Sequence, residues 1–183
     1  MLYNKTVRLK DGRDCVLRNC TAADAEGVLR NFLATHAQTD FLTSQPEEIT
    51  MTLEQEADYL RKRAESPDEI EILAEVDGQV VGTAGIDRVR RYENVKHRCA
   101  FGISIDRDFW GLGIGRALTE ACIECARSVG YLQMELEVVS ENRRAVALYR
   151  SAGFAEYGRN PRAFRSPRSG WQENILMRLE LDK

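Results

Sequence analysis

The chain has 183 residues, of which 43% are hydrophobic and 30% are charged, and its formal net charge is −3. These values predict one globular domain, residues 1–183, with a sizeable core and no nucleic-acid footprint. No apolar run is long enough to cross a membrane, and the first residues lack the hydrophobic region of a signal peptide. We therefore expect a cytoplasmic protein, monomer or homodimer, that binds neither nucleic acid nor membrane.

The first third of the chain predicts a hairpin followed by two helices. A turn at 10–13 separates two short apolar runs within 7–17. A capping sequence at 21–24 opens a helix that fades near His36, and a second helix is expected over 52–66. The apolar stripe predicted for the first helix contains Val28, Leu29, Phe32 and Leu33.

An antiparallel meander should follow. Residues 69–76 and 79–86 read as strands joined at Asp77-Gly78, which is a strong hairpin signal. A charged, turn-like segment leads to a third strand at 98–106, where apolar residues alternate with small or polar ones.

After this strand the hydrophobic period changes to that of a helix, which ends at Gly130. Between strand and helix lie Gly111, Gly113 and Gly115, which leave bare backbone where the unpaired N–H groups of the helix point outward. Such a helix start holds a phosphate or diphosphate. We expect an anion-bearing cofactor here, although the glycines could also serve only close packing of the helix on the strand.

Two common phosphate loops fit this segment poorly. A nucleoside-triphosphate loop requires Lys and then Ser or Thr after its last glycine, whereas here Arg116 and Ala117 follow Gly115. The dinucleotide fingerprint has the spacing Gly-x-Gly-x-x-Gly near the start of a βαβ unit, and neither condition holds. A dinucleotide-binding oxidoreductase module therefore remains only as a weak alternative.

Residues 132–139 alternate again, so strand, helix and strand should form a right-handed crossover between parallel strands. Asn142 then caps a short helix that ends at Gly153. Two final strands are expected at 156–159 and 174–181, joined by a loop rich in Arg, Pro and Gly.

Two separated motifs resemble the GNAT superfamily of acetyl-CoA-dependent N-acetyltransferases. The first is Trp110-Gly-Leu-Gly-Ile-Gly115, and the second is Asn142-x-x-Ala145-x-x-Leu148-Tyr149-x-x-x-Gly153-Phe154. The match covers roughly residues 70–157. Trp110 departs from the family pattern, in which Gln or Arg is usual, and resembles the branch that acts on ribosomal-protein N-termini and small amines.

The resemblance implies an α/β fold, with a mixed, mostly antiparallel sheet, helices on both faces and a coenzyme cleft at one parallel β-α-β unit. If the two parallel strands splay, unpaired groups near residues 103–105 would receive the pantetheine arm. The cofactor contacts that it implies are Ile103, Ser104, Ile105, Trp110, Gly111, Leu112, Gly113, Ile114, Gly115, Arg116, Asn142 and Tyr149.

Tyr149 and Glu137 are the predicted catalytic residues. The phenol of Tyr149 stays protonated at neutral pH and can protonate a departing thiolate. Glu137 lies near the C-terminal end of its strand and matches the base of the ribosomal-protein branch, although a water chain could equally remove the proton.

The cysteines and histidines predict no metal or redox centre. Cys122 and Cys125 fall on the apolar stripe in the middle of a helix, away from the N-terminus where a reactive thiolate is stabilised. The two histidines, His36 and His97, are far apart in the sequence and have no paired spacing. We expect five reduced, packed thiols and no metal.

The acceptor is the least determined part of the prediction. We expect a small-molecule or peptide amine: a protein N-terminus is suggested by Glu137 with Tyr149, and a polyamine or other small cation by the acidic stretch 47–71. The basic stretch 159–168 could face an anionic substrate or the cofactor's phosphate, although both stretches could simply be solvated. A non-catalytic acetyl-CoA sensor is the main alternative to an enzyme.

Overall fold

The computed structural model describes residues 1–182, and its strands and helices follow in a mixed order along the chain. The elements are β1 (Asn4–Arg8), β2 (Asp14–Asn19), η1 (Ala22–Asp24), α1 (Ala25–Gln38), η2 (Pro46–Glu48), α2 (Leu53–Glu65), β3 (Ile70–Val76), β4 (Gln79–Arg88), η3 (Glu93–Val95), β5 (Arg98–Ile105), η4 (Arg107–Phe109), α3 (Ile114–Ser128), β6 (Gln133–Val139), α4 (Arg143–Ser151), β7 (Ala155–Ser166) and β8 (Gly170–Glu180).

Within residues 1–182, eight strands form one sheet in the order β1-β2-β3-β4-β5-β6-β8-β7. Neighbours pair antiparallel, with the exception of β5 and β6, which are parallel and connected through α3. The predicted first hairpin and the β3-β4-β5 meander are confirmed. So is the mixed, mostly antiparallel fold class with one parallel unit.

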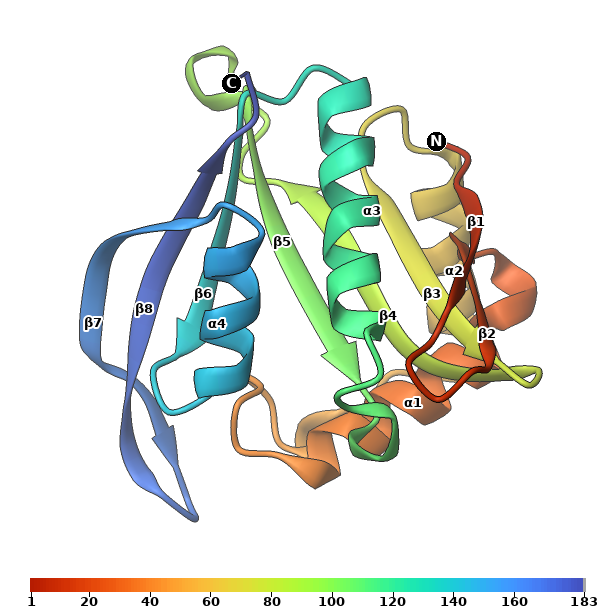
Figure 1. Ribbon diagram of the computed structural model, residues 1–183, viewed down its shortest axis with the longest axis horizontal. Coiled ribbons are helices and arrows are strands. Elements are labelled where there is room, and N and C mark those ends of the chain that lie inside the picture. The colour runs from red at the N-terminus through yellow and green to blue at the C-terminus, as the bar shows by residue number, and fades with distance from the viewer. Residues whose placement is uncertain (183) are drawn as a thin grey trace.

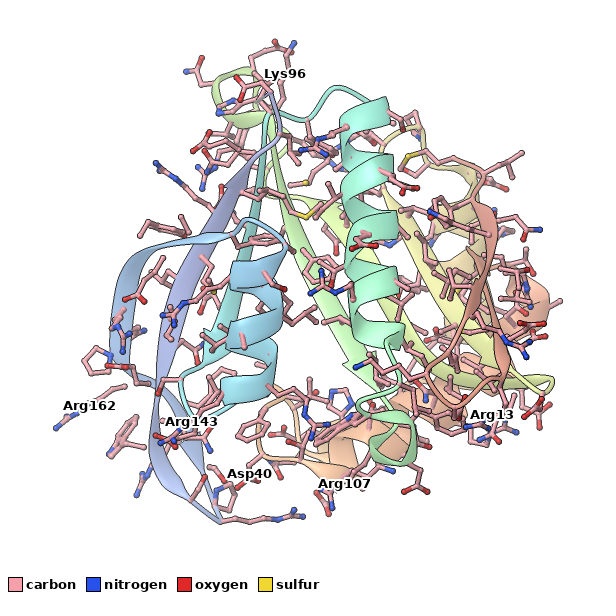
Figure 2. The ribbon with its side chains drawn as sticks, viewed as in Figure 1. Arg13, Asp40, Lys96, Arg107, Arg143 and Arg162 are labelled. Carbon is pink, nitrogen blue, oxygen red and sulfur yellow. The ribbon has the colours of Figure 1, made fainter. Side chains whose placement is uncertain are left out.

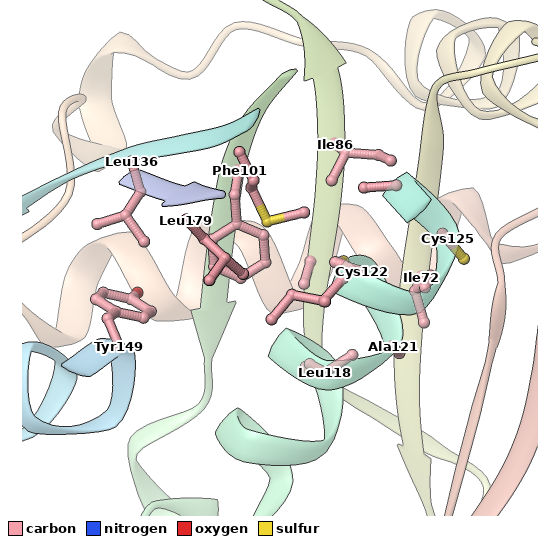
Figure 3. Packing of buried hydrophobic residues seen from close by; sticks show 14 of the residues in the cluster. Ile72, Ile86, Phe101, Leu118, Ala121, Cys122, Cys125, Leu136, Tyr149 and Leu179 are labelled. Atoms are coloured by element: carbon pink, nitrogen blue, oxygen red, sulfur yellow. The ribbon is translucent and has the colours of Figure 1, made fainter. Parts of the chain in front are cut away.

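Helices cover both faces of this sheet, as predicted (Figure 1). The larger apolar cluster lies between the sheet and α3 and α4, where side chains from β3, β4 and β5 meet the stripe of α3 (Figure 3). A smaller cluster under α1 and α2 is built around Val28, Leu60 and Leu73. All five cysteines are buried and unpaired, with Cys122 and Cys125 in the larger cluster. No helix in the described chain is long and apolar enough to span a membrane.

The predicted stripe of α1 is only partly right. Val28 is buried, but Phe32 and Leu33 are 36% and 38% exposed, whereas Asn31 and His36 are buried. The buried edge of the helix is therefore rotated toward polar residues. The ring of His36 packs at a tilt against that of Phe32, with centroids 4.0 Å apart. Its Nδ1 lies 2.7 Å from the Phe32 carbonyl, so this ring nitrogen has a hydrogen-bond partner within the helix.

The predicted loop between the last two strands is also wrong. β7 continues to Ser166 and β8 begins at Gly170, so most of the Arg-rich segment is a long hairpin that extends beyond the sheet. Pro161 misled the sequence interpretation because proline cannot donate to a ladder. The strand accommodates it in a register shift between Asn160 and Phe164.

A half-buried, poorly solvated carboxyl group lies on the α2 face of the sheet. Glu71 of β3 lies opposite Gly85 of β4, and any side chain at Gly85 would collide with its carboxyl group. Desolvation raises the pKa of Glu71 to about 7, and the nearby Arg63 guanidinium offsets part of this effect.

Glu71→Gln should therefore stabilise the protein at alkaline pH. The unfolded carboxyl releases its proton near its ordinary pKa and the folded one near 7, so the native state loses stability as the pH rises between these values. We expect the variant to be about 2–3 kcal/mol more stable than the unaltered chain at pH 8 and nearly equal to it at pH 4. Urea unfolding at the two pH values measures this; a pH-independent difference would contradict it.

Candidate functional site

The two parallel strands separate soon after they meet. β5 and β6 pair at Arg98↔Gln133, Cys99↔Met134 and Ala100↔Glu135, and pairing ends there. β5 stays bound to β4 as far as Ile105, and β6 stays bound to β8 as far as Val139. The inner edges of both strands are therefore left without a sheet partner, which confirms the expected splay.

A cavity of about 980 Å³ occupies this opening. Its walls come from the ends of β5 and β6, the glycine loop, α4, the segment after α1 and the side chain of Phe164. Of the predicted site residues, the cavity is lined by Ile103, Ser104, Ile105, Trp110, Gly111, Gly113, Gly115, Arg116, Glu137, Asn142 and Tyr149. The fold thus brings predicted residues from four separate segments together around one cavity: β5, the glycine loop with the start of α3, β6, and α4 with its cap.

Leu112 and Ile114 are the two predicted contacts that do not line the cavity. Ile114 is buried in the main core, because the first turn of α3 points this side chain at the sheet. The carbonyl of Leu112 accepts a hydrogen bond from the Lys10 amide at 3.1 Å, which ties the glycine loop to the β1–β2 turn.

The glycine loop has the backbone that an anion site requires. Gly111 and Gly113 have φ values of 84° and 107°, in the left-handed region where a side chain is strained. Gly113 caps α3, and the intrahelical ladder begins with the Ala117 amide bonding to the Gly113 carbonyl. The amides of residues 114–116 lie ahead of that ladder, at the positive end of the helix dipole.

Basic side chains surround this helix start. Lys10, Arg116 and Arg144 line the cavity, and Arg107 lies on η4 just before the glycine loop. Figure 2 shows Arg107 and Arg143 at the end of the molecule where β5 and β6 terminate. This arrangement suits a ligand that carries several negative charges.

Trp110 organises two of these arginines. Its indole N–H donates to the Ile105 carbonyl at 2.7 Å, which satisfies one main-chain acceptor at the end of β5. The guanidinium carbons of Arg144 and Arg107 lie 5.2 and 5.8 Å from its ring, within cation–π range. The departure from the family pattern at this position therefore replaces a polar side chain with an aromatic platform.

Tyr149 of α4 faces the cavity from the apolar core. It is 7% exposed and packs edge-on against Phe101, with ring centroids 6.1 Å apart. Figure 3 shows it beside Leu136, at the side of the cluster formed by α4. Burial raises the pKa of the Tyr149 phenol well above its ordinary value, so the hydroxyl is protonated at neutral pH and available as a proton donor.

Glu137, the predicted base, lines the cavity, whereas Glu135 on the same strand does not. The Oε2 of Glu137 accepts a hydrogen bond from Asn174 Nδ2 at 3.1 Å. Glu135, on the same strand face, is instead engaged by Arg98 in an ion pair that lowers the pKa of its carboxyl. Of these two glutamates, Glu137 is the better placed to accept a proton.

The sequence analysis missed one set of residues that line the cavity. Phe41 and Leu42 from the segment after α1 line the cavity, together with Phe164 of β7 and Asn174 of β8. Asp40 accepts hydrogen bonds from the hydroxyls of Ser166 and Ser169, at 2.8 and 3.0 Å, and so joins this segment to the tip of the β7–β8 hairpin. We name residues 39–43 together with Phe164 the acceptor wall.

The charged side chains of the acidic stretch 47–71 and of the basic stretch 159–168 do not line the cavity. None of the acidic residues within 47–71 lines the cavity; Asp58 and Asp68, for example, form ion pairs with arginines of their own surroundings. In the basic stretch, Arg162 and Arg165 lie over the ring of Trp171 near the hairpin tip. Among residues 1–182, no group of three or more His, Cys, Asp or Glu side chains could hold a metal ion.

A splayed parallel pair beside a glycine-capped helix start defines a protein that binds an extended, anionic coenzyme. The chain belongs to the acetyltransferase (GNAT) family, whose sequence profile matches residues 33–154.

Curated relatives carry N-acyltransferase names. The chain is 27% identical over 113 residues to the L-amino acid N-acyltransferase MnaT of Escherichia coli, which covers 61% of this chain and 64% of the relative. It is 38% identical over 101 residues to the N-alpha-acetyltransferase RimI of Mycobacterium tuberculosis, with coverage of 55% and 61%. Both matches span just under two thirds of the relative's length. A longer match, 26% identical over 91% of this chain and 94% of the relative, is to an L-methionine sulfoximine/L-methionine sulfone acetyltransferase of Pseudomonas aeruginosa.

Solved structures share the fold. A GNAT-family acetyltransferase from Streptococcus pneumoniae superposes with a TM-score of 0.84 at 29% identity, over 91% of this chain and 99% of that one. The yncA protein of Salmonella typhimurium, solved with its cofactor acetyl-CoA, gives a TM-score of 0.82 at 20% identity, over 92% and 95%.

Replacing Gly113 by Ala should weaken coenzyme binding. A Cβ at a φ of 107° is strained, so relaxation would rotate the first amides of α3 away from the anion. We expect a loss of about 1 kcal/mol in unfolding free energy and a raised Kd for acetyl-CoA, measured by urea unfolding and calorimetry.

Gly130→Ala is the matched control, because Gly130 has a φ of 85° just beyond the other end of α3 and does not line the cavity. It should lose similar stability and retain the unaltered affinity for acetyl-CoA. The same Kd in both variants would contradict the assignment of the loop.

Proposed function

We propose that this chain is an acetyl-CoA-dependent N-acetyltransferase that acetylates a primary amine by direct attack in a ternary complex. The observation that carries the proposal is the single cavity that joins the glycine loop, Tyr149 and Glu137. The family match and the names of the curated relatives support the reaction class. They name different acceptors, an amino acid and a protein α-amine.

The glycine-loop side of the cavity holds the donor. The amides at the start of α3 receive the diphosphate, and Lys10, Arg116 and Arg144 add positive charge around it. The free edge of β5 at residues 103–105 receives the extended pantetheine arm by main-chain hydrogen bonds, in the manner of an added strand. A main-chain N–H of that edge polarises the thioester carbonyl.

Tyr149 and Glu137 move the protons. Glu137 accepts a proton from the ammonium form of the acceptor, and the freed nitrogen attacks the thioester carbonyl carbon. A C–N bond forms as the C–S bond breaks, and the Tyr149 hydroxyl protonates the departing thiolate. The nitrogen that has attacked the carbonyl carries an acidic proton, and its release to the tyrosinate, directly or through solvent, restores the Tyr149 hydroxyl and offsets the unfavourable phenol-to-thiolate transfer.

Direct transfer is favoured over a covalent acyl-enzyme. None of the five cysteines lines the cavity, and burial raises the pKa of each thiol whose value is shifted, including Cys99 and Cys122. A buried, protonated thiol is a poor nucleophile. The amine must therefore be present in the cavity together with the thioester.

The acceptor wall gives the first indication of acceptor chemistry. Phe41, Leu42 and Phe164 present apolar surface, while Glu137 supplies a negative charge at the reacting end. A primary ammonium group attached to an uncharged, partly apolar substituent fits this combination. Because no residue of the acidic stretch lines the cavity, a polyamine is less well supported than an amino acid or a peptide N-terminus.

An acceptor screen tests the proposal. Purified protein with fixed acetyl-CoA and a panel of amino acids, N-terminal peptides, lysine and polyamines should release thiol with an apolar α-amine, and initial rates in both substrates should give intersecting double-reciprocal plots. Parallel plots would indicate an acyl-enzyme. Tight acetyl-CoA binding without turnover on any amine would instead favour the sensor.

Tyr149→Phe should retain coenzyme binding and lose turnover. The substitution removes only the hydroxyl, so packing against Phe101 is kept and kcat should fall by about 100-fold. Tyr131→Phe is the control, because this tyrosine is 5% exposed but does not line the cavity. Steady-state kinetics of the two variants measure the difference, and an equal kcat in both would remove Tyr149 from the mechanism.

A further inference from the structure

The carboxylate of Glu137 is oriented by one neighbouring side chain. Within residues 1–182, its side-chain hydrogen bond is the one from Asn174 Nδ2 to Oε2, at 3.1 Å. The other oxygen, Oε1, is left to accept a proton. When one oxygen of a carboxylate is held by a hydrogen bond, the orientation of the other oxygen is fixed as well.

The sheet register brings these two side chains together. β6 and β8 are antiparallel, with Glu137 opposite Leu176 and Val139 opposite Asn174. Glu137 and Asn174 are therefore diagonal neighbours on one face of the sheet, a separation that long side chains can bridge. The Ser140 amide, which donates to the Glu173 carbonyl at 2.8 Å, continues this pairing just beyond the end of β6.

Asn174 is an unfavourable residue for packing alone. It is 2% exposed, and its Oδ1 is buried without a hydrogen-bond partner in the described chain. An apolar side chain of similar size would avoid the desolvation of that oxygen. The amide is therefore better explained by the hydrogen bond that it donates than by the stability of β8.

The kind of partner also matters. Glu135 shows the alternative, in which Arg98 pairs with the carboxylate and lowers its pKa, making it a weaker base. A neutral amide fixes the orientation of Glu137 and leaves its negative charge uncompensated, so the carboxylate can still attract an ammonium group.

We propose that Asn174 is the positioning residue of the catalytic base, holding Glu137 so that its free oxygen faces the acceptor amine. This inference rests on the proposed function. Asn174 acts through Glu137, and its contribution to turnover should disappear when the carboxylate is removed.

A double-mutant cycle tests this dependence. Asn174→Leu, Glu137→Gln and the double variant are compared with the unaltered protein at saturating acetyl-CoA and amine. We expect N174L alone to lower kcat by about 10–100-fold, with the KM for acetyl-CoA within about twofold of the unaltered value. In the E137Q background the same substitution should change kcat by less than about twofold.

Two further variants keep the result interpretable. Asn174→Asp keeps the size of the side chain and removes the donor, so it replaces N174L if the leucine variant does not fold. Asn31→Leu is the matched control: Asn31 is also buried with an unpartnered Oδ1, but it does not line the cavity. Its kcat should equal that of the unaltered protein.

The remaining outcomes of the cycle distinguish failure of the positioning role from failure of the proposed function. An equal loss of kcat from N174L in both backgrounds, or no loss in either, would overturn the positioning role and leave the proposed function standing. Full activity of E137Q would remove the base and the role of Asn174 with it. Absence of turnover by the unaltered protein with every amine would overturn the proposed function itself, and the role would fall as a consequence.

Discussion

The separation of β5 from β6 after three residue pairs is the constraint on which the site depends. A parallel pair that continued would consume the main-chain groups of both strands and close the cavity. Here β4 and β8 hold the outer edges, so the inner edges stay apart without unravelling the sheet. The core supports this from the α3 and α4 side, where Phe101 and Tyr149 fill the widening gap beneath the cavity.

In the proposed function, the two sides of the cavity recognise their ligands through different kinds of group. On the donor side the recognising groups are mostly main-chain: the free edge of β5 and the amides ahead of the α3 ladder, reinforced by basic side chains. On the acceptor side they are side chains from segments far apart in the sequence, residues 39–43 and Phe164. Recognition by main-chain groups depends less on the identity of one side chain, such as Trp110, than recognition by side chains does.

This difference explains which parts of the site could be predicted from the sequence. The glycine spacing, the Asn142 cap and the strand alternation are local signals, and the residues that they indicated, Tyr149, Glu137 and most of the loop, line one cavity. The acceptor wall has no local signal, since Phe164 lies in a segment whose Pro161 reads as a loop and Asp40 acts through distant serines. The buried edge of α1 was misjudged because tertiary packing selected Asn31 over Phe32.

The hydrogen bonds from Ser166 and Ser169 to Asp40 couple the position of residues 39–43 to that of the β7–β8 hairpin tip. A bulky substituent that displaces residues 39–43 must also move the tip of the β7–β8 hairpin, or else break two hydrogen bonds to one carboxylate. Under the proposed function, discrimination by size is thus shared with a turn that does not line the cavity, and the selectivity for the acceptor depends on the hairpin as well as on the cavity.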